Sequence, residues 1–191
     1  VSIKSCLSYT FSVSNSQGAS LIKDRPFTAE MTRSIMLLKE KPYRPRMADY
    51  RIGVFFTGRE QLGEGAKTTA PVYYANRWDI QPSDTAAYLR GEKVKPTKQI
   101  VFYIDNTFPE KWKPYLREGV TQWNELFEQI GFKDVVAAKD FPTDDPEFDP
   151  DNIKYSCVRY APSSIENAMG PSWVDPRSGE ILNASVYLYH K

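Results

Sequence analysis

The sequence predicts an α+β fold in which a mixed β-sheet packs on one long amphipathic helix and is preceded by a β-rich region. Two patterns carry this prediction. Apolar side chains recur at helical spacing over residues 107–130, and short strand-like runs flank that stretch on both sides. The chain has 191 residues, of which 41% are apolar, so it can bury a core as one domain or two small ones.

The first half of the chain is predicted to be rich in β-structure. Alternating apolar and polar side chains favour strands over residues 1–13 and 28–38, with a polar turn at 15–18 after the first. Two more β-rich stretches are predicted at residues 50–57 and 70–80, joined by a connection that contains Gly58, Gly63 and Gly65. Ser83 is predicted to cap a short helix that runs through Leu89.

The segment 107–130 is predicted to be a single helix of about five to six turns. Thr107 and Glu110 have the spacing of a capping box, and Pro109 fits the first turn. Gly131 is placed to end the helix. The predicted apolar stripe repeats every three or four residues: Trp112, Tyr115, Leu116, Val120, Trp123, Phe127 and Ile130.

The strands of the second half are predicted on both sides of this helix. They are residues 99–105 before it, and residues 132–139, 153–160, 167–175 and 180–189 after it. Gly170 and Pro171 make the strand at 167–175 irregular, which is typical of a sheet edge. The residues Asp-Pro-Arg-Ser-Gly at 175–179 predict a tight turn into the last strand.

Histidine and cysteine are scarce, which limits the chemistry available to this chain. It has one histidine, His190, and two cysteines, Cys6 and Cys157. A zinc site needs three or four suitable ligands, and a catalytic triad needs a histidine held on both sides. Either the chain does no histidine-dependent chemistry, or part of an enzyme lies outside it; strand-like patterns at both ends suggest a fragment. Cys157 lies within a strand pattern, as expected of a structural thiol.

Charge is distributed unevenly along the chain. Residues 1–98 hold 16 Lys and Arg against 9 Asp and Glu, whereas residues 99–191 hold 9 against 15. No nucleic-acid-binding motif accompanies the basic residues, so we expect a solvated or partner-facing surface and no nucleic-acid partner. The acidic loop 140–151 either binds calcium or is simply solvated, because prolines interrupt it and the EF-hand pattern is absent. No apolar run is long enough to span a membrane, and no signal peptide is visible.

The irregular strand at 167–175 is the best candidate for a binding site. An edge strand leaves backbone N–H and C=O groups available, and an extended peptide can pair with them by strand addition. The alternative is an ordinary edge that Pro171 protects against aggregation.

Several short motifs of the second half occur together in one known family. They are Ile-Val-Phe-Tyr-Ile-Asp at 100–105, Pro-x-x-Trp at 109–112, Val-x-x-Trp-Asn at 120–124, Ile-Gly-Phe at 130–132, Asn-Ala-Met-Gly-Pro-Ser-Trp at 167–173 and Asp-Pro-Arg-Ser-Gly-Glu-Ile-Leu at 175–182. Together they resemble the N-terminal part of a metzincin-like zinc metallopeptidase catalytic domain, in particular that of large peptidases from Bacteroidetes. The upstream module of those peptidases is similar at residues 33–38 and 45–49. The resemblance implies a β-rich module at 1–95 and an incomplete catalytic domain at 96–191.

The resemblance implies a zinc-dependent metalloendopeptidase acting in the periplasm or at the outer membrane. In that family a His-Glu-x-x-His helix follows the last strand, so no zinc or catalytic residue is expected here and the fragment alone is predicted to be inactive. A polypeptide substrate is the implied partner, and the residues implied to bind it are Ala168, Met169, Gly170, Pro171, Ser172 and Trp173. A non-catalytic module that binds protein through the edge strand or the basic surface is the alternative. Substrate specificity and oligomeric state stay open.

Overall fold

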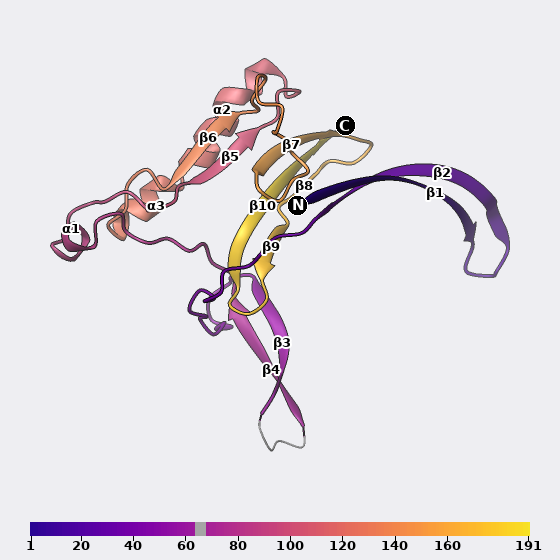
Figure 1. Cartoon of the computed structure of the whole chain (residues 1–191). Coiled ribbons are helices and arrows are strands. Elements are labelled where there is room, and N and C mark those ends of the chain that lie inside the picture. The colour runs from indigo at the N-terminus through magenta and orange to yellow at the C-terminus, as the bar shows by residue number, and fades with distance from the viewer. Residues whose placement is uncertain (64–67) are drawn as a thin grey trace. The chain divides into compact units, whose positions relative to one another are not determined.

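The structure, a computed structural model, describes residues 1–63 and 68–191 and divides the chain into two compact units, Val1–Leu37 and Leu38–Lys191. Strands dominate both halves and the helices are few and short, which confirms a mixed α and β composition with a β-rich first half (Figure 1). Among the described residues, no helix has the length and apolar character needed to cross a membrane.

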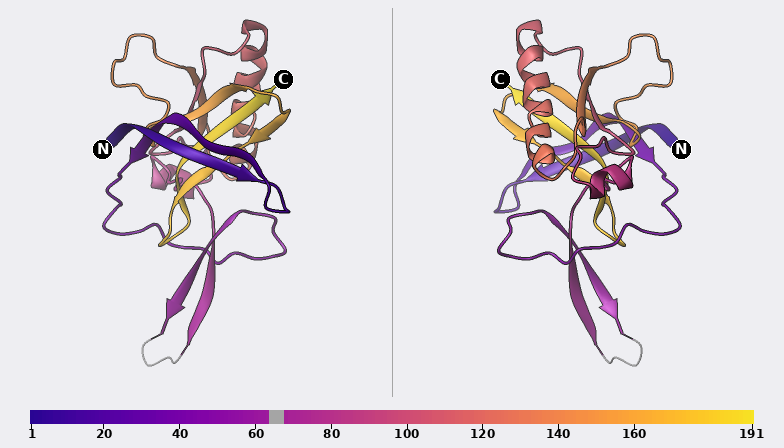
Figure 2. Two further views of the ribbon diagram at one scale, coloured as in Figure 1. Left: turned by 90° about the vertical axis from the view of Figure 1, so that its right-hand side faces the viewer. Right: turned by 90° about the vertical axis from the view of Figure 1, so that its left-hand side faces the viewer.

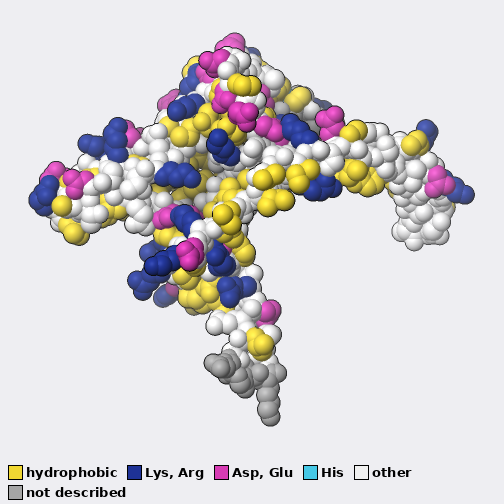
Figure 3. Space-filling view, viewed as in Figure 1, with side chains coloured by type: hydrophobic (Ala, Val, Ile, Leu, Met, Phe, Trp, Pro, Cys, Tyr) yellow, Lys and Arg dark blue, Asp and Glu magenta, His cyan; other side chains and the backbone are white. Residues whose placement is uncertain are grey.

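The first unit is a long antiparallel hairpin of β1 (Ser2–Ser14) and β2 (Ser20–Ser34). The turn between them forms where predicted, because the Asn15 side chain accepts hydrogen bonds from the backbone N–H groups of Gln17 and Ala19, at 3.0 and 2.8 Å. On one face the rings of Tyr9 and Phe27 stack at 5.4 Å. Hydrophobic side chains lie at the surface along this hairpin (Figure 3).

The second unit begins with irregular chain and a shorter antiparallel hairpin, β3 (Phe56–Leu62) with β4 (Thr69–Ala75). Strand β3 occupies most of the predicted connection, so that expectation is wrong for Gly58, while Gly65 lies outside the described residues. Helix α1 (Thr85–Leu89) follows. Its cap is Asp84 and not the predicted Ser83, because an Asp84 carboxylate oxygen accepts the Ala87 N–H at 2.9 Å.

The main sheet of the second unit contains β5 (Ile100–Ile104), β6 (Val136–Asp140), β7 (Ser156–Pro162), β8 (Asn167–Met169), β9 (Ser172–Asp175) and β10 (Glu180–His190). Its strand order is β6-β5-β7-β10-β8, and β9 also pairs with β10. The first four strands pair in parallel, whereas β8 and β9 run antiparallel to β10. The predicted mixed sheet is therefore confirmed, with its antiparallel part at one edge.

The single long helix predicted at 107–130 is replaced by three short ones, η1 (Glu110–Trp112), α2 (Lys113–Thr121) and α3 (Asn124–Gln129). The predicted capping box does not form, because the Thr107 hydroxyl donates to the Asp105 carboxylate at 2.8 Å. At the second break the Thr121 hydroxyl donates back to the Arg117 carbonyl at 2.9 Å, a bond that competes with the helical ladder.

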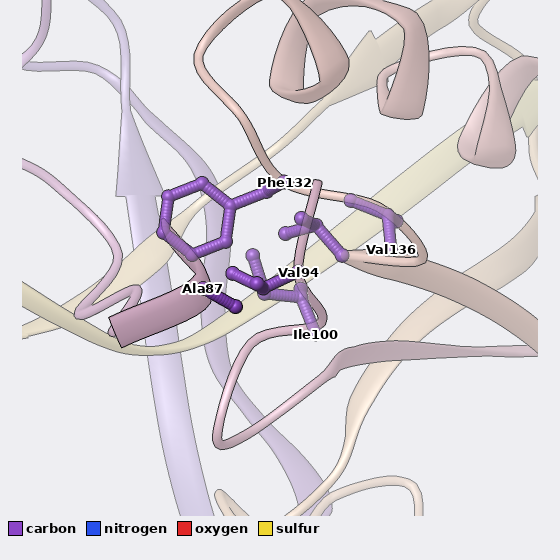
Figure 4. Close-up of a cluster of buried hydrophobic side chains, with 6 residues drawn as sticks. Ala87, Val94, Ile100, Phe132 and Val136 are labelled. Carbon is purple, nitrogen blue, oxygen red and sulfur yellow. The ribbon is translucent and has the colours of Figure 1, made fainter. Parts of the chain in front are cut away.

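Two buried clusters of hydrophobic side chains lie between the helices and the sheet. The side views show α2 and α3 on one face of the sheet (Figure 2). The first gathers Ala87, Val94, Ile100, Phe132 and Val136 (Figure 4). The second gathers Ile104, Phe108 and Val158. Part of the predicted stripe packs on these clusters, namely Trp112, Leu116, Val120 and Phe127, whereas the remaining members are exposed: Tyr115, Trp123 and Ile130.

Candidate functional site

The six predicted substrate-binding residues, 168–173, lie at the antiparallel edge of the main sheet. Strand β8 is the last strand in the sheet order, and β9 continues along the same side of β10 (Figure 1). All three residues of β8 are exposed. The structure thus has an accessible strand edge where the sequence predicted one.

The hydrogen bonds of β10 show which residues of this edge face outward. The Ser185 N–H donates to the Pro171 carbonyl at 3.0 Å, so the backbone carbonyl of Pro171 points inward toward β10. The Ala184 N–H donates away from the edge, to the Ser156 hydroxyl on β7 at 3.1 Å, so its neighbour Ser172 forms a non-hydrogen-bonded pair. Because such pairs alternate along an antiparallel ladder, the backbone groups that face outward belong to three alternate residues, Ala168, Gly170 and Ser172.

The Gly170–Pro171 step separates β8 from β9 and leaves space at the edge. A Cβ atom placed on Gly170 would meet no other atom within 4 Å. The side chains on either side are large and accessible, since Met169 is 50% exposed and Trp173 is 44% exposed. Met169 is also anchored to β10, because its sulfur accepts the Tyr189 hydroxyl at 3.7 Å. The edge therefore combines outward backbone groups with exposed apolar side chains.

The acidic loop covers part of the sheet face opposite the helices. Phe148 from the loop packs on Tyr103 of β5, with ring centroids 5.2 Å apart, and Asp151 forms an ion pair with Arg159 of β7. Asp145 and Asp149 accept backbone N–H groups within the loop. Across residues 1–63 and 68–191, no three His, Cys, Asp or Glu side chains are grouped so as to hold a metal ion.

Charged side chains brace the turn that joins β9 to β10. Asp175 is 1% exposed, and the Arg177 guanidinium donates to both of its carboxylate oxygens, at 3.0 and 2.7 Å. These hydrogen bonds lower the pKa of Asp175 despite its burial. Gly179 adopts a positive φ of 74°, where its missing Cβ avoids the Ala75 carbonyl. The predicted turn is confirmed.

A second ionic group holds the upstream segment of this unit to β10. The Lys39 ammonium lies 2.7 Å from both Asp79 and Glu180, and Glu180 is buried. Hydrogen bonds to these two carboxylates raise the pKa of Lys39. Lys39 is one of the basic residues that the sequence predicted to form a solvated or partner-facing surface, and its side chain stays 55% exposed while it pairs with these two carboxylates. The sequence alone gave no signal for a pair so distant along the chain.

Of the two free cysteines, Cys157 is buried and Cys6 is exposed, and the single histidine lies against aromatic side chains. Cys157 is buried and fully covered, and its burial raises the pKa of the thiol to about 12. The ring of His190 lies at the end of β10, where Nδ1 is 2.8 Å from the Tyr160 hydroxyl and the Trp112 ring packs edge-on at 4.8 Å. The expectation that Cys157 is a structural thiol is consistent with its burial.

Comparison with known proteins matches only the upstream part of the chain. Residues 1–83 match the family model of a domain of unknown function, DUF5117. No curated protein and no solved structure matches the chain. The matched segment includes β1 to β4 and ends before the main sheet, so it does not reach the edge formed by β8 and β9.

Proposed function

We propose that this chain is part of a zinc-dependent metalloendopeptidase of the metzincin-like type, and that its edge strand holds the polypeptide substrate. One observation carries the proposal: β8 and β9 form an exposed, antiparallel edge beside an otherwise parallel sheet. The motifs at 100–105, 167–173 and 175–182 supply the resemblance to that family. The division into an upstream module at 1–95 and a catalytic part at 96–191 is a prediction within this proposal.

The edge would bind a peptide through its backbone. The outward groups of Ala168, Gly170 and Ser172 are spaced two residues apart, which is the repeat of an extended partner strand. Main-chain hydrogen bonds of this kind provide affinity for many sequences, and side-chain contacts add selectivity. Met169 and Trp173 are the exposed apolar side chains next to these groups.

The proposed enzyme contains zinc, but the proposal assigns no zinc ligand to the described residues of this chain. The absence of any suitable group of ligands in residues 1–63 and 68–191 means that no residue here is assigned to the metal. When bound, zinc would activate a water molecule for attack on the peptide bond. The proposed contribution of this chain is to align the substrate, and the resemblance places the enzyme in the periplasm or at the outer membrane.

Substitution of Gly170 by proline tests whether the edge binds peptide. Proline removes the outward N–H donor, and a Cβ atom at position 170 would meet no other atom within 4 Å. An end-capped heptapeptide of alternating valine and threonine is titrated into ¹⁵N-labelled chain, and the amide resonances of Ala168, Gly170 and Ser172 are followed. The wild-type resonances should shift, and Gly170→Pro should weaken binding about fivefold or more, the equivalent of one hydrogen bond.

Gly119→Ala is the matched control, because Gly119 lies on α2 with open space around it. This variant should bind the heptapeptide as the wild type does. Equal binding by Gly170→Pro and wild type, or shifts confined to residues away from the edge, would refute the role of β8 and β9.

A non-catalytic binding module is the second candidate, because it could use the same exposed edge. Metal content separates it from the peptidase. A polypeptide that continues about one hundred residues beyond Lys191, roughly the size of a small domain, should contain stoichiometric zinc if the peptidase proposal holds. Peptide binding at the edge without zinc would favour the module instead.

A further inference from the structure

One of the three outward donors at the edge already has a partner. The Ala168 N–H donates to the Oδ1 atom of Asn167, the preceding residue, at 2.8 Å. Both residues belong to β8 and both are exposed. Asn167 pairs with Tyr189 of β10 in the ladder, so its backbone is held by the sheet while its side-chain oxygen accepts the N–H of the next residue.

We propose that the Asn167 side chain competes with the substrate for the edge, an inference that rests on the proposed function. Its amide oxygen occupies the position that a substrate carbonyl would take on the Ala168 N–H. A peptide that pairs along the whole edge must displace this oxygen, whereas a peptide that pairs only with Gly170 and Ser172 need not. Asn167 thereby selects by the length of chain that the edge engages.

The competition is weak enough to be overcome and strong enough to measure. The hydrogen bond joins two adjacent residues of an exposed strand. The Asn167 side chain can therefore break it by rotating into water, which solvates the amide. A net hydrogen bond of this kind corresponds to about a three- to tenfold change in a binding constant. The same hydrogen bond occupies a backbone donor at a sheet edge, which limits unwanted strand pairing.

Asn167→Ala and Asn167→Asp test the inference with two peptides. The probes are the end-capped valine–threonine heptapeptide, which can span Ala168 to Ser172, and its end-capped tripeptide, which can cover only part of that edge. Asn167→Ala should bind the heptapeptide about fivefold more tightly than wild type and should bind the tripeptide with unchanged affinity. Asn167→Asp keeps an acceptor oxygen in place and should bind the heptapeptide no more tightly than wild type.

Amide hydrogen exchange at Ala168 provides a readout that needs no ligand. Exchange should be slower in wild type and Asn167→Asp than in Asn167→Ala, because only the first two retain the acceptor. Equal exchange rates in wild type and Asn167→Ala, or heptapeptide affinity that does not rise in Asn167→Ala, would overturn the competition.

Gly170→Pro separates this failure from failure of the proposed function. If Gly170→Pro loses the heptapeptide while Asn167→Ala merely equals wild type, the edge binds peptide and the competition is wrong. If Gly170→Pro binds as wild type does, the edge is not the binding site and both proposals fall.

Discussion

Asp175 shows how single residues set the geometry of the edge. Its carboxylate is buried, it accepts both the guanidinium and the backbone N–H of Arg177, and it lies at the end of β9. Arg177 in turn donates to the Lys39 carbonyl at 2.8 Å. One carboxylate therefore fixes the turn from which β9 and β10 run side by side.

Substitution of Asp175 by asparagine should destabilise the chain by about 1–3 kcal/mol at pH 7, because it removes charge-assisted hydrogen bonds to Arg177. The pKa of Asp175 is lowered in the folded state, so its contribution is complete above the unfolded pKa of about 3.9 and is lost as the pH falls through the folded value. Urea unfolding measured from pH 7 to pH 3 should show the variant and wild type converging at the acid end.

Asp144→Asn is the control, because Asp144 is an exposed residue of the acidic loop, and its effect should stay within about 0.5 kcal/mol. A difference between Asp175→Asn and wild type that is as large at pH 3 as at pH 7 would contradict this account of Asp175.

The burial of Cys157 predicts a silent thiol. With a pKa of about 12 its thiolate fraction at pH 8 is about a thousandfold smaller than that of an ordinary cysteine. In a Cys6→Ser variant, which leaves Cys157 as the only thiol, Ellman's reagent should react at least about tenfold more slowly with folded chain than with chain in urea. Rapid reaction of the folded variant would show that Cys157 is accessible.

At the scale of elements, α3 is a separate short helix and not the end of the continuous helix that the sequence predicts, and its first residue is bonded to β6. The Asn124 amide donates to the Val136 carbonyl and accepts the Val136 N–H, both at 2.8 Å. The side chain thus acts as an additional rung beside the first residue of β6, in a sheet whose β6 and β5 pair in parallel.

Asn124→Ala should lower the free energy of unfolding by about 1–3 kcal/mol, because the backbone N–H and C=O of Val136 lose their partners in a buried position. Gln129→Ala, an exposed position at the end of the same helix, should change it by no more than about 0.5 kcal/mol. Guanidinium unfolding of both variants provides the comparison, and equal midpoints would show that the Asn124 bonds do not support α3.

Elements with local signals could be predicted from the sequence. Three features are predicted by the residue types within a few positions, and all three form as expected: the strand at 100–104, the Gly170–Pro171 interruption and the turn at 175–179. The edge position of 168–173 follows from the second of these signals.

Features that depend on distant partners could not be predicted in this way. Thr107 and Asn124 bond to groups outside the helices, and at the break between α2 and α3 the Thr121 hydroxyl donates back to the Arg117 carbonyl. Helical periodicity carries no information about such bonds, so the predicted apolar stripe includes Tyr115 and Trp123, which are exposed in the structure. The hydrogen bond from the Ala168 N–H to the Asn167 side chain is local, yet no sequence pattern distinguishes Asn167 from an ordinary polar residue at a strand end.

At the scale of the whole molecule, the two units carry different surfaces. The hairpin of Val1–Leu37 exposes the apolar side chains Tyr9, Phe11 and Phe27. The second unit alone contains the main sheet and every residue of the candidate site. Substrate alignment as proposed therefore depends on residues 38–191, and the hairpin is not assigned a part in it.

Peptide hydrolysis should be measured on a polypeptide that continues about one hundred residues beyond Lys191. We expect stoichiometric zinc and cleavage of an unfolded protein substrate, with activity lost on chelation and restored by zinc. Gly170→Pro should retain the zinc but raise KM about fivefold or more, because the substrate strand loses a backbone donor. A zinc-free polypeptide without hydrolysis, or a zinc peptidase whose KM is unchanged by Gly170→Pro, would contradict the proposal that β8 and β9 present the substrate.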